Sequence, residues 1–463
     1  TNIAEQAEST ETVIGSQLEE LFTRLISKGI DEQRVLETIT SMRCDLVLTA
    51  HPTEITRRTL IQKYNRIASA LNDVNEDKEL DTQERLDLER LIAEVWFTDE
   101  IRTERPTPQD EAKWGYAVIE HSLWSAIPRL WNRLSELTLK VTGETLPLSV
   151  APIKISSWMG GDRDGNPNVT ADVTKEILRL ARWMAADLYL RDVEELLSQL
   201  SMSNCSSELA AECPQGVDEP YRHILRSLRE RLAATRIWAE TSEPPEPGLI
   251  HSDADLIAPL QLCYDSLLSC GMDIIADGLL KETLIRANTF GVTLVELDIR
   301  QSSDKHIELL DAITEYLELG SYKHWSEKAR TDFLLQELKT RRPLVPDNWY
   351  PEGDAGEILK TFRLIAEDNG QGIASYIISM ARRPSDVLGV VLLLRKSGVT
   401  RVLPVVPLFE TLDDLENAAW TLECLLRTNW YTEYIDGSQQ IMIGYSDSAK
   451  DAGQMAASWA QYR

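Results

Sequence analysis

Cysteine is scarce in this sequence, with six residues among 463. The six are widely scattered and none belongs to a CxxC pair, so the sequence supports neither a zinc knuckle nor a dithiol redox site. We expect reduced thiols that act as small core residues, which is the usual state of cysteine in the cytoplasm.

Positively charged residues are also few. The sequence has 48 Lys and Arg against 75 Asp and Glu, which gives a formal net charge of −27. A protein this acidic repels nucleic-acid backbones and anionic membranes, so we predict neither as a partner. Long apolar runs are missing as well, since the best of them, Val387–Leu394, is far too short to span a bilayer. The hydrophobic fraction of 43% and the charged fraction of 27% are typical of a globular chain.

The two ends of the sequence lack the usual start and stop signals. Residues Thr1–Glu5 show no basic region followed by an apolar stretch, so we predict no signal peptide. The chain has no initiator Met, and its last residues stop inside a helical pattern without a capping residue or a glycine. We therefore expect a fragment of a longer protein.

Most of the sequence has apolar residues at helical spacing, and stretches rich in Pro and Gly separate these segments. Six short β-branched runs lie between them, each followed by polar residues and then by a helix. The predicted helices are Gln17–Ser27, Arg57–Leu71, Arg85–Trp96, Glu111–Leu137, Val173–Leu200, Glu219–Trp238, Leu256–Leu267, Lys305–Leu317, Ser326–Leu338, Gly356–Ala366, Ser385–Lys396 and Leu412–Leu426. The predicted strands are Leu46–Thr49, Ile153–Trp158, Val292–Ile299, Ala374–Ser379, Val402–Leu408 and Ile441–Ile443.

A repeated succession of strand, polar loop and helix predicts parallel strands with helical crossovers. Six such strands are two short of a closed eight-stranded barrel. The sequence therefore predicts a predominantly helical α/β fold, an incomplete (β/α)8 barrel with many extra helices. In such folds, sites form where the carboxyl ends of the strands converge, so the residues that follow each strand are the candidates for chemistry.

A histidine follows the first predicted strand. Pro52 favours an extended backbone at His51, which places the imidazole at a strand end beside Arg57 and Arg58. A histidine in this position can exchange a proton near neutral pH. The alternative is that His51 only hydrogen-bonds a loop.

The second predicted strand leads into Gly160–Pro167 (GGDRDGNP). This order resembles a calcium loop, but the glycine is misplaced and Val173 stands where the bidentate Glu should be. We predict a tight turn with an exposed Arg163 that contacts a ligand, and glycines that let the backbone approach it. An Asx-rich turn that caps the next helix is the alternative.

The third predicted strand delivers Arg300 into the start of a helix. A guanidinium there could bind phosphate or carboxylate with two hydrogen bonds. The alternative is an ion pair with Asp298 or Asp304.

The fifth and sixth predicted strands end near Glu410 and Asp447. Two carboxylates together with waters and a substrate oxygen are a common way to hold Mg²⁺. We expect Lys450 in the first turn of the helix that follows, where the helix dipole already favours an anion. Taken singly, either carboxylate could instead be an ordinary helix N-cap.

Together these segments resemble phosphoenolpyruvate carboxylase of the bacterial type. The resemblance extends from about Leu46 to the last residue, and it is specific because five independent motifs occur in the family's order. The motifs are Leu48–Glu54 (LTAHPTE), Gly160–Pro167 (GGDRDGNP), Leu297–Gln301 (LDIRQ), Phe409–Leu415 (FETLDDL) and Met442–Gly453 (MIGYSDSAKDAG).

The resemblance implies functions for the polar candidates. His51 matches the catalytic histidine of the family, and Lys450 matches a second active-site residue. Glu410 and Asp447 match the carboxylates that bind Mg²⁺ or Mn²⁺. Arg300 matches an arginine on the phosphate side of the substrate.

The resemblance also implies an apolar pocket and a reaction. Trp158, Leu408 and Met442 match a pocket near the reacting carbon, where a nonpolar wall shelters CO₂ and an enolate from water. The implied reaction joins phosphoenolpyruvate and bicarbonate to give oxaloacetate and phosphate, an anaplerotic carbon fixation that feeds the tricarboxylic acid cycle. It passes through carboxyphosphate and pyruvate enolate, with His51 assisting proton movement and a divalent cation acting as Lewis acid.

The chain departs from the family pattern at its end. It stops before the glycine- and arginine-rich loop that clamps carboxyphosphate, and it lacks the last strands of the barrel and most of the allosteric inhibitor site. We therefore read residues 1–463 as part of a single catalytic domain whose C-terminal half is missing. The isolated chain is expected to be inactive with an aggregation-prone barrel edge, and the full-length enzyme to be a cytoplasmic homotetramer.

Two other functions fit the same sequence. One is a different phosphoenolpyruvate-handling barrel enzyme that transfers phosphate without fixing carbon, which phosphate release with and without bicarbonate would distinguish. The other is a non-catalytic acidic helical scaffold whose polar strand ends are only capping groups. A scaffold should show no tight Mn²⁺ site that depends on Glu410.

Overall fold

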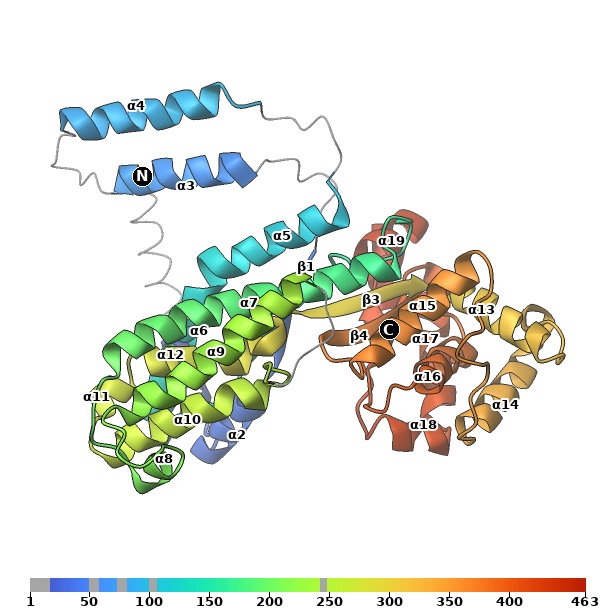
Figure 1. Cartoon of the computed structure of the whole chain (residues 1–463). Coiled ribbons are helices and arrows are strands. Elements are labelled where there is room, and N and C mark those ends of the chain that lie inside the picture. Colours follow the sequence, from blue (N-terminus) through green and yellow to red (C-terminus); the bar gives the residue numbers. More distant parts are fainter. Residues whose placement is uncertain (1–16, 50–57, 73–80, 100–105, 242–247) are drawn as a thin grey trace.

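The computed structural model describes residues 17–49, 58–72, 81–99, 106–241 and 248–463. Its centre is one sheet of six parallel strands in the spatial order β1-β2-β3-β4-β5-β6, surrounded by many helices (Figure 1). The strands are β1 Cys44–Leu48, β2 Ile153–Ser157, β3 Glu296–Ser302, β4 Ile373–Ser379, β5 Val405–Phe409 and β6 Met442–Ile443.

The sheet curls into an open half-barrel, which confirms the predicted incomplete (β/α)8 barrel and its six strands. Every residue of β5 is buried, and so is nearly all of β4, as expected for inner strands of a parallel sheet covered on both faces. β1 lies at the edge of the sheet and is mostly exposed. Each strand pairs with its successor in the chain, so all carboxyl ends point to the same rim of the half-barrel.

Several helices begin where a side chain caps their first amide groups. Asp81, Thr107, Ser252 and Thr411 each take part in a capping box with an acid three residues later. The helices are α2 Glu32–Ser41, α3 Arg58–Asn72, α4 Thr82–Trp96, α5 Pro108–Val118, α6 Trp124–Thr142, α7 Ala171–Gln199, α8 Ser207–Ala211, α9 Pro220–Thr241, α10 Asp253–Ser269, α11 Asp273–Ala276, α12 Leu279–Phe290, α13 Ser303–Tyr316, α14 Glu327–Leu338, α15 Asp354–Glu367, α16 Pro384–Ser397, α17 Leu412–Leu426, α18 Asn429–Tyr434, α19 Tyr445–Ala452 and α20 Gln454–Tyr462, and residues 17–27 are also helical.

The predicted helix Glu111–Leu137 is interrupted in the structure. A π-helical turn, Ile119–Leu123, separates α5 from α6. Pro128 lies inside α6 and has no amide N–H, so the carbonyl of Trp124 one turn earlier loses its usual donor. The Arg286 guanidinium donates to that carbonyl instead, at 2.8 Å.

Two predicted strands begin too early in the sequence. The expected strand Val292–Ile299 starts only at Glu296, because Gly291–Thr293 form a 3-10 turn and Leu294 has a positive φ of 61°. The strand expected from Val402 starts at Val405, directly after a proline whose carbonyl accepts a hydrogen bond from the β4 backbone. Val292, Leu294 and Val295 ahead of β3, and Leu403 ahead of β5, are buried in the core without entering the sheet, whereas Val402 is half exposed.

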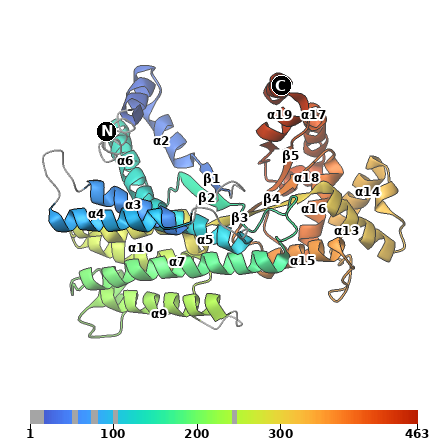
Figure 2. The ribbon, with the colours of Figure 1, turned by 90° about the horizontal axis from the view of Figure 1, so that it is seen from above.

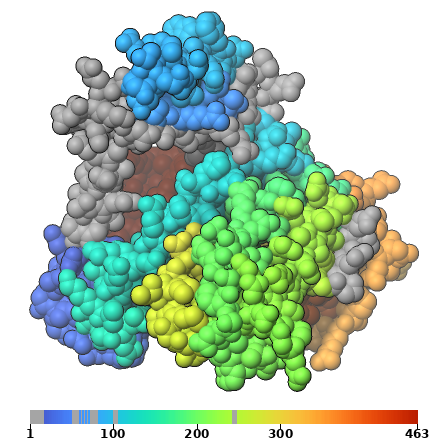
Figure 3. Space-filling view, turned by 60° about the vertical axis from the view of Figure 1, so that its left-hand side comes forward, coloured from blue at the N-terminus to red at the C-terminus, as the bar shows by residue number. Residues whose placement is uncertain are grey.

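The core has two large parts that meet at β3. The first packs the helices before β3, and its centre is the long pair α7 and α9, which form one continuous surface in the space-filling view (Figure 3). The second packs α13 to α17 against β3, β4 and β5. Figure 2 shows these two parts on either side of the sheet.

The structure agrees with two expectations drawn from composition. All six cysteines are free thiols, but the expected core position is met only by Cys263, which is buried, and is wrong for Cys44, which is exposed. No helix in the described ranges combines the length and the apolar character needed to cross a membrane.

Candidate active site at the carboxyl ends of the strands

The loop Gly160–Pro167 follows β2 and forms tight turns, as predicted. Gly160 and Gly165 adopt positive φ values of 82° and 72°, which glycine allows without strain. Gly161 lies so close to the carbonyl of Asp298 that a Cβ there would collide with β3. The glycines therefore let this loop rest directly on the neighbouring strand.

The prediction that Arg163 is exposed is wrong. Its side chain turns inward, so that the residue keeps only 8% of its surface, and it donates to the Gly161 carbonyl at 3.0 Å and to the Thr174 hydroxyl at 2.6 Å. Burial lowers the pKa of this guanidinium. The reason for the inward turn is that α7 begins just beyond the loop and places a hydroxyl within reach. Arg163 thus ties the loop to α7 and does not face an open site.

Arg300 on β3 lies against the same loop. Its guanidinium binds the Asp162 carboxylate with two hydrogen bonds, from Nε at 2.8 Å and from Nη2 at 2.7 Å, while Asp164 lies 3.9 Å away. Burial alone would lower the pKa of Arg300, but Asp162, Asp164 and Glu410 raise it above its usual value. The alternative prediction for Arg300 was an ion pair with Asp298 or Asp304. Arg300 does form ion pairs, but its partners are Asp162 and Asp164 of the loop.

Three predicted apolar residues come together in the structure. Trp158 and Met442 pack on a small buried cluster of Ile377, Val406 and Leu408. These side chains come from β4, β5, β6 and the end of β2, and they lie inside the half-barrel. The apolar wall is thus a product of the parallel strand order, which brings side chains nearly 300 positions apart in the sequence into contact.

Glu410 directly follows β5 and is 7% exposed. It accepts a hydrogen bond from the amide of Met380 at 3.4 Å, and Gly444 leaves room for its side chain. Met380 has a positive φ of 56°, an uncommon conformation for this residue type that presents its amide to the carboxylate. Burial raises the pKa of Glu410, and the nearby charges of Asp164 and Asp447 raise it further.

Asp447 and Lys450 lie on α19, next to the end of β6. Asp447 is in the first turn of this helix, and its carboxylate pairs with the Lys450 ammonium at 3.1 Å. The expectation that Lys450 lies in the first turn is wrong, because α19 already begins at Tyr445 and the lysine falls in its last turn. Neither Glu410 nor Asp447 is a helix N-cap, since Thr411 and Gly444 occupy those positions.

The donor set at this rim matches a hard divalent cation. The described part of the chain contains no group of three or more His, Cys, Asp or Glu side chains arranged to hold a metal. Glu410 and Asp447 nevertheless offer two carboxylates close enough for one to raise the pKa of the other. Mg²⁺ is usually held by one or two carboxylates, with waters and substrate oxygens completing the octahedron. The residues present therefore fit such an ion.

One predicted site residue is not described by the structure, and two acids of the site were not predicted from the sequence. His51 lies outside the described residues, so its position at the end of the first strand remains a prediction. Asp162 and Asp164 were not assigned a role, although both belong to the loop motif and both face Arg300. The order Asp162-Arg163-Asp164 could have predicted their role, because alternate residues of a turn place the two acids on one side and the arginine on the other.

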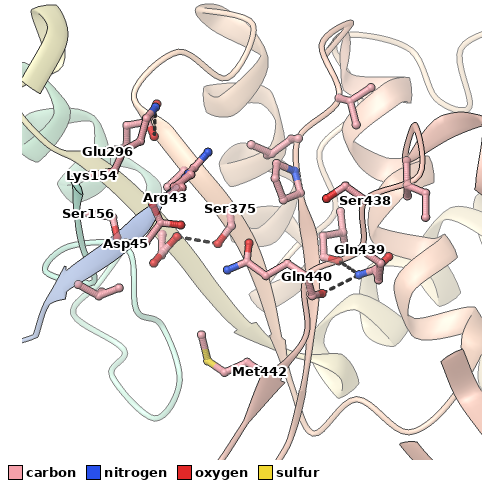
Figure 4. A pocket seen from close by; sticks show the side chains of 18 of the residues that line it. Arg43, Asp45, Lys154, Ser156, Glu296, Ser375, Ser438, Gln439, Gln440 and Met442 are labelled. Carbon is pink, nitrogen blue, oxygen red and sulfur yellow. Dashed lines mark hydrogen bonds and ion pairs between the residues drawn. The ribbon is translucent and has the colours of Figure 1, made fainter. Parts of the chain in front are cut away.

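A hollow opens at the amino-terminal ends of the strands, opposite the rim that carries the candidate site (Figure 4). Its volume is about 570 Å³, and Arg43, Asp45, Lys154 and Glu296 surround its mouth. Ser375 and Met442 also line it, so it extends inside the half-barrel toward the apolar wall. The predicted polar site residues Arg300, Glu410 and Asp447 lie at the other rim.

Comparison with known proteins identifies relatives of the whole chain. A family model described as phosphoenolpyruvate carboxylase matches residues 1–463. The chain is 51% identical to the phosphoenolpyruvate carboxylase of Hahella chejuensis, over 100% of this chain and 54% of the relative. It is 53% identical to that of Pseudomonas aeruginosa and 52% identical to that of Marinobacter nauticus, in both cases over 96% of this chain.

These matches agree with the five motifs and with the half-barrel that carries them. The chain spans about half the length of the curated relatives it matches. The family match, in contrast, covers every residue of the sequence. The chain belongs to the phosphoenolpyruvate carboxylase family.

Proposed function

We propose that this chain contributes the metal-binding and phosphate-binding part of an active site that carboxylates phosphoenolpyruvate. The observation that carries the proposal is the convergence of Arg300, Glu410 and Asp447 at one rim, beside the apolar wall formed by Trp158, Leu408 and Met442. Bicarbonate and phosphoenolpyruvate would be joined there to give oxaloacetate and phosphate. The relatives in Hahella chejuensis and Pseudomonas aeruginosa are named phosphoenolpyruvate carboxylase, which supports this proposal.

In this proposal each polar residue has its own role in binding the substrate or the metal ion. Arg300 would bind the phosphate group, with Asp162 holding its guanidinium in a fixed plane. Glu410 and Asp447 would hold Mg²⁺ or Mn²⁺. A divalent cation bound there would supply Lewis-acid stabilisation of the negative charge that develops on the substrate. Arg163 would support the loop without touching the substrate.

The remaining residues would manage protons and exclude water. His51 would assist proton movement as carboxyphosphate breaks down to CO₂ and phosphate, and Lys450 would add positive charge at the rim. The apolar wall would shelter CO₂ and the enolate from solvent until the new carbon–carbon bond forms.

We further propose that residues 1–463 are part of a single catalytic domain and that the isolated chain does not turn over. The support is the match to about half of each relative. From the family resemblance alone we propose a cytoplasmic, allosterically regulated homotetramer for the full-length protein.

The metal and substrate sites can be tested by titrating the chain with Mn²⁺ and following free Mn²⁺ by paramagnetic resonance. We expect one tight site that Glu410→Ala abolishes and that phosphoenolpyruvate strengthens. Glu416→Ala, an exposed acid on α17, serves as the matched control and should bind like the wild type. Absence of a tight site, or equal loss in both variants, would contradict the proposal.

Turnover is tested separately by measuring oxaloacetate and phosphate with and without bicarbonate. We expect neither product from the isolated chain. Bicarbonate-dependent oxaloacetate would refute the expected inactivity, whereas phosphate release that is independent of bicarbonate would indicate a phosphate-transferring enzyme.

A further inference from the structure

We propose that Asp298 is a positioning residue that orients Arg300 through the indole ring of Trp158. This inference rests on the proposed function, in which Arg300 binds the phosphate of the substrate. Asp298 makes no ion pair with Arg300, whose partners are Asp162 and Asp164, so in this proposal it acts through an intermediary.

The Arg300 guanidinium is held from two directions. Asp162 fixes the plane of the group through two parallel hydrogen bonds. The Trp158 ring lies under the guanidinium, with its centroid 4.7 Å from Cζ. An arginine stacked on an aromatic face gains a cation–π attraction, so the tilt of the ring sets the direction in which the remaining N–H groups point.

The Trp158 ring in turn has one polar anchor. Its indole N–H donates to Asp298 Oδ2 at 3.1 Å. Apart from this hydrogen bond and the Arg300 guanidinium, the ring packs on the apolar cluster that contains Leu408. Apolar packing is not directional, so the hydrogen bond to Asp298 is the contact that defines the rotation of the ring.

Asp298 is itself fixed on its other oxygen. The Ser375 hydroxyl on β4 donates to Asp298 Oδ1 at 2.6 Å, and Ser375 is seen beside the hollow in Figure 4. Asp298 is 5% exposed. Asp298 and Arg300 are two positions apart on β3, so their side chains share one face of the strand. A single buried carboxylate thus links β3, β4 and the end of β2 beneath Arg300.

Placing a carboxylate here has a cost. Burial raises the pKa of Asp298, and the charges of Asp45 and Glu296 at the mouth of the hollow raise it further, against the hydrogen bonds from Ser375 and Trp158. An apolar residue would avoid that cost but could not accept the indole N–H. Orientation of the ring is the function that accounts for a hydrogen-bond acceptor at this position.

The first test needs no substrate. Phenylglyoxal modifies accessible arginines, and mass spectrometry gives the rate at Arg300. We expect Asp298→Ala and Trp158→Phe each to raise this rate several-fold, and the double variant to react no faster than either single one. Asp298→Asn keeps an acceptor oxygen for the indole and should restore a rate near that of the wild type.

Asp45→Asn is the matched control, because Asp45 lines the same hollow without contacting the indole, and its rate should not change. Equal rates in all variants would overturn the proposal. Additive increases in the double variant would also overturn it, because they would mean that Asp298 acts on Arg300 by a route other than Trp158.

The second test measures phosphoenolpyruvate binding in the presence of Mn²⁺ by calorimetry. We expect a loss of about tenfold for Asp298→Ala and for Trp158→Phe, with Asp298→Asn and Asp45→Asn close to the wild type. A wild-type chain that binds no phosphoenolpyruvate would refute the proposed function, while the modification rates would still decide the positioning role.

Discussion

Asp162 and Arg300 are 138 positions apart in the sequence, yet their side chains are joined by two hydrogen bonds of 2.8 and 2.7 Å. The backbones also pair, since the Arg300 amide donates to the Gly161 carbonyl and the Arg300 carbonyl accepts from the Arg163 amide, both at 2.9 Å. The loop after β2 therefore extends the sheet by one further bridge beside β3. The cation of the site and its carboxylate partner are held by the fold before any ligand arrives.

Removing one charge from this pair should destabilise the protein. We expect Asp162→Asn to lower the free energy of unfolding by about 1–3 kcal/mol, because a charge-assisted bidentate contact is lost from a mostly buried guanidinium. Urea unfolding measures the change. Asp164→Asn, 3.9 Å from Arg300, is the control and should cost clearly less. Equal costs would show that net charge at the loop matters more than the bidentate geometry.

The buried Arg163 guanidinium has two acceptors, the Gly161 carbonyl and the Thr174 hydroxyl. Thr174 accepts from the Arg163 guanidinium at 2.6 Å and donates to the Gly160 carbonyl at 2.7 Å. We expect Thr174→Val to lower the free energy of unfolding by about 1–3 kcal/mol, because a buried charged group loses one of its two acceptors. Thr138→Val replaces a buried threonine whose hydroxyl serves only its own helix, and its cost in urea should be smaller. A larger cost for Thr138→Val would refute this role of Thr174.

A buried histidine away from the site should make stability depend on pH. His306 contacts the Tyr376 hydroxyl through Nε2 at 2.8 Å, and burial lowers its pKa to about 3. Below about pH 6.5 the unfolded chain takes up a proton that the folded chain refuses, so stability falls as pH decreases toward 3, by at most about 1.4 kcal/mol per pH unit. Urea unfolding across this range should show a shallower slope for His306→Gln. The surface variant His121→Gln should keep the wild-type slope, and an unchanged slope in His306→Gln would contradict the assignment.

The metal site should show the opposite dependence on pH. Because the pKa of Glu410 is raised in the folded state, the folded chain binds the extra proton, and stability falls as pH rises from the ordinary carboxyl range through the raised pKa. Glu410→Gln should therefore be more stable than the wild type at neutral pH and similar to it in acid. Mn²⁺ needs the ionised carboxylate, so its affinity should rise with pH and its binding should stabilise only the wild type. Thermal unfolding with and without Mn²⁺ measures both effects, and stabilisation of the Gln variant by Mn²⁺ would argue against Glu410 as a ligand.

Periodicity and motif order were sufficient for the architecture. The predicted helix Leu412–Leu426 matches α17 residue for residue, because Thr411 caps its start and its apolar spacing runs to its end. All six strands were found at the predicted places, although Val292–Ile299 and Val402–Leu408 were begun too early. Four of the residues assigned too soon, Val292, Leu294, Val295 and Leu403, are apolar and buried, and burial has the same sequence signature whether or not the backbone joins a sheet.

For the candidate site, too, part could be predicted from the sequence and part could not. The sequence by itself determined which residues stand at the strand ends, because parallel strands with helical crossovers place all carboxyl ends at one rim. Only the tertiary structure decided that Arg163 turns inward to Thr174, that Arg300 pairs with Asp162, and that Trp158 rests on Asp298. Local propensity and spacing act over a few residues, whereas hydrogen-bond partners and burial are chosen by whichever side chains the packed fold brings within 3 Å.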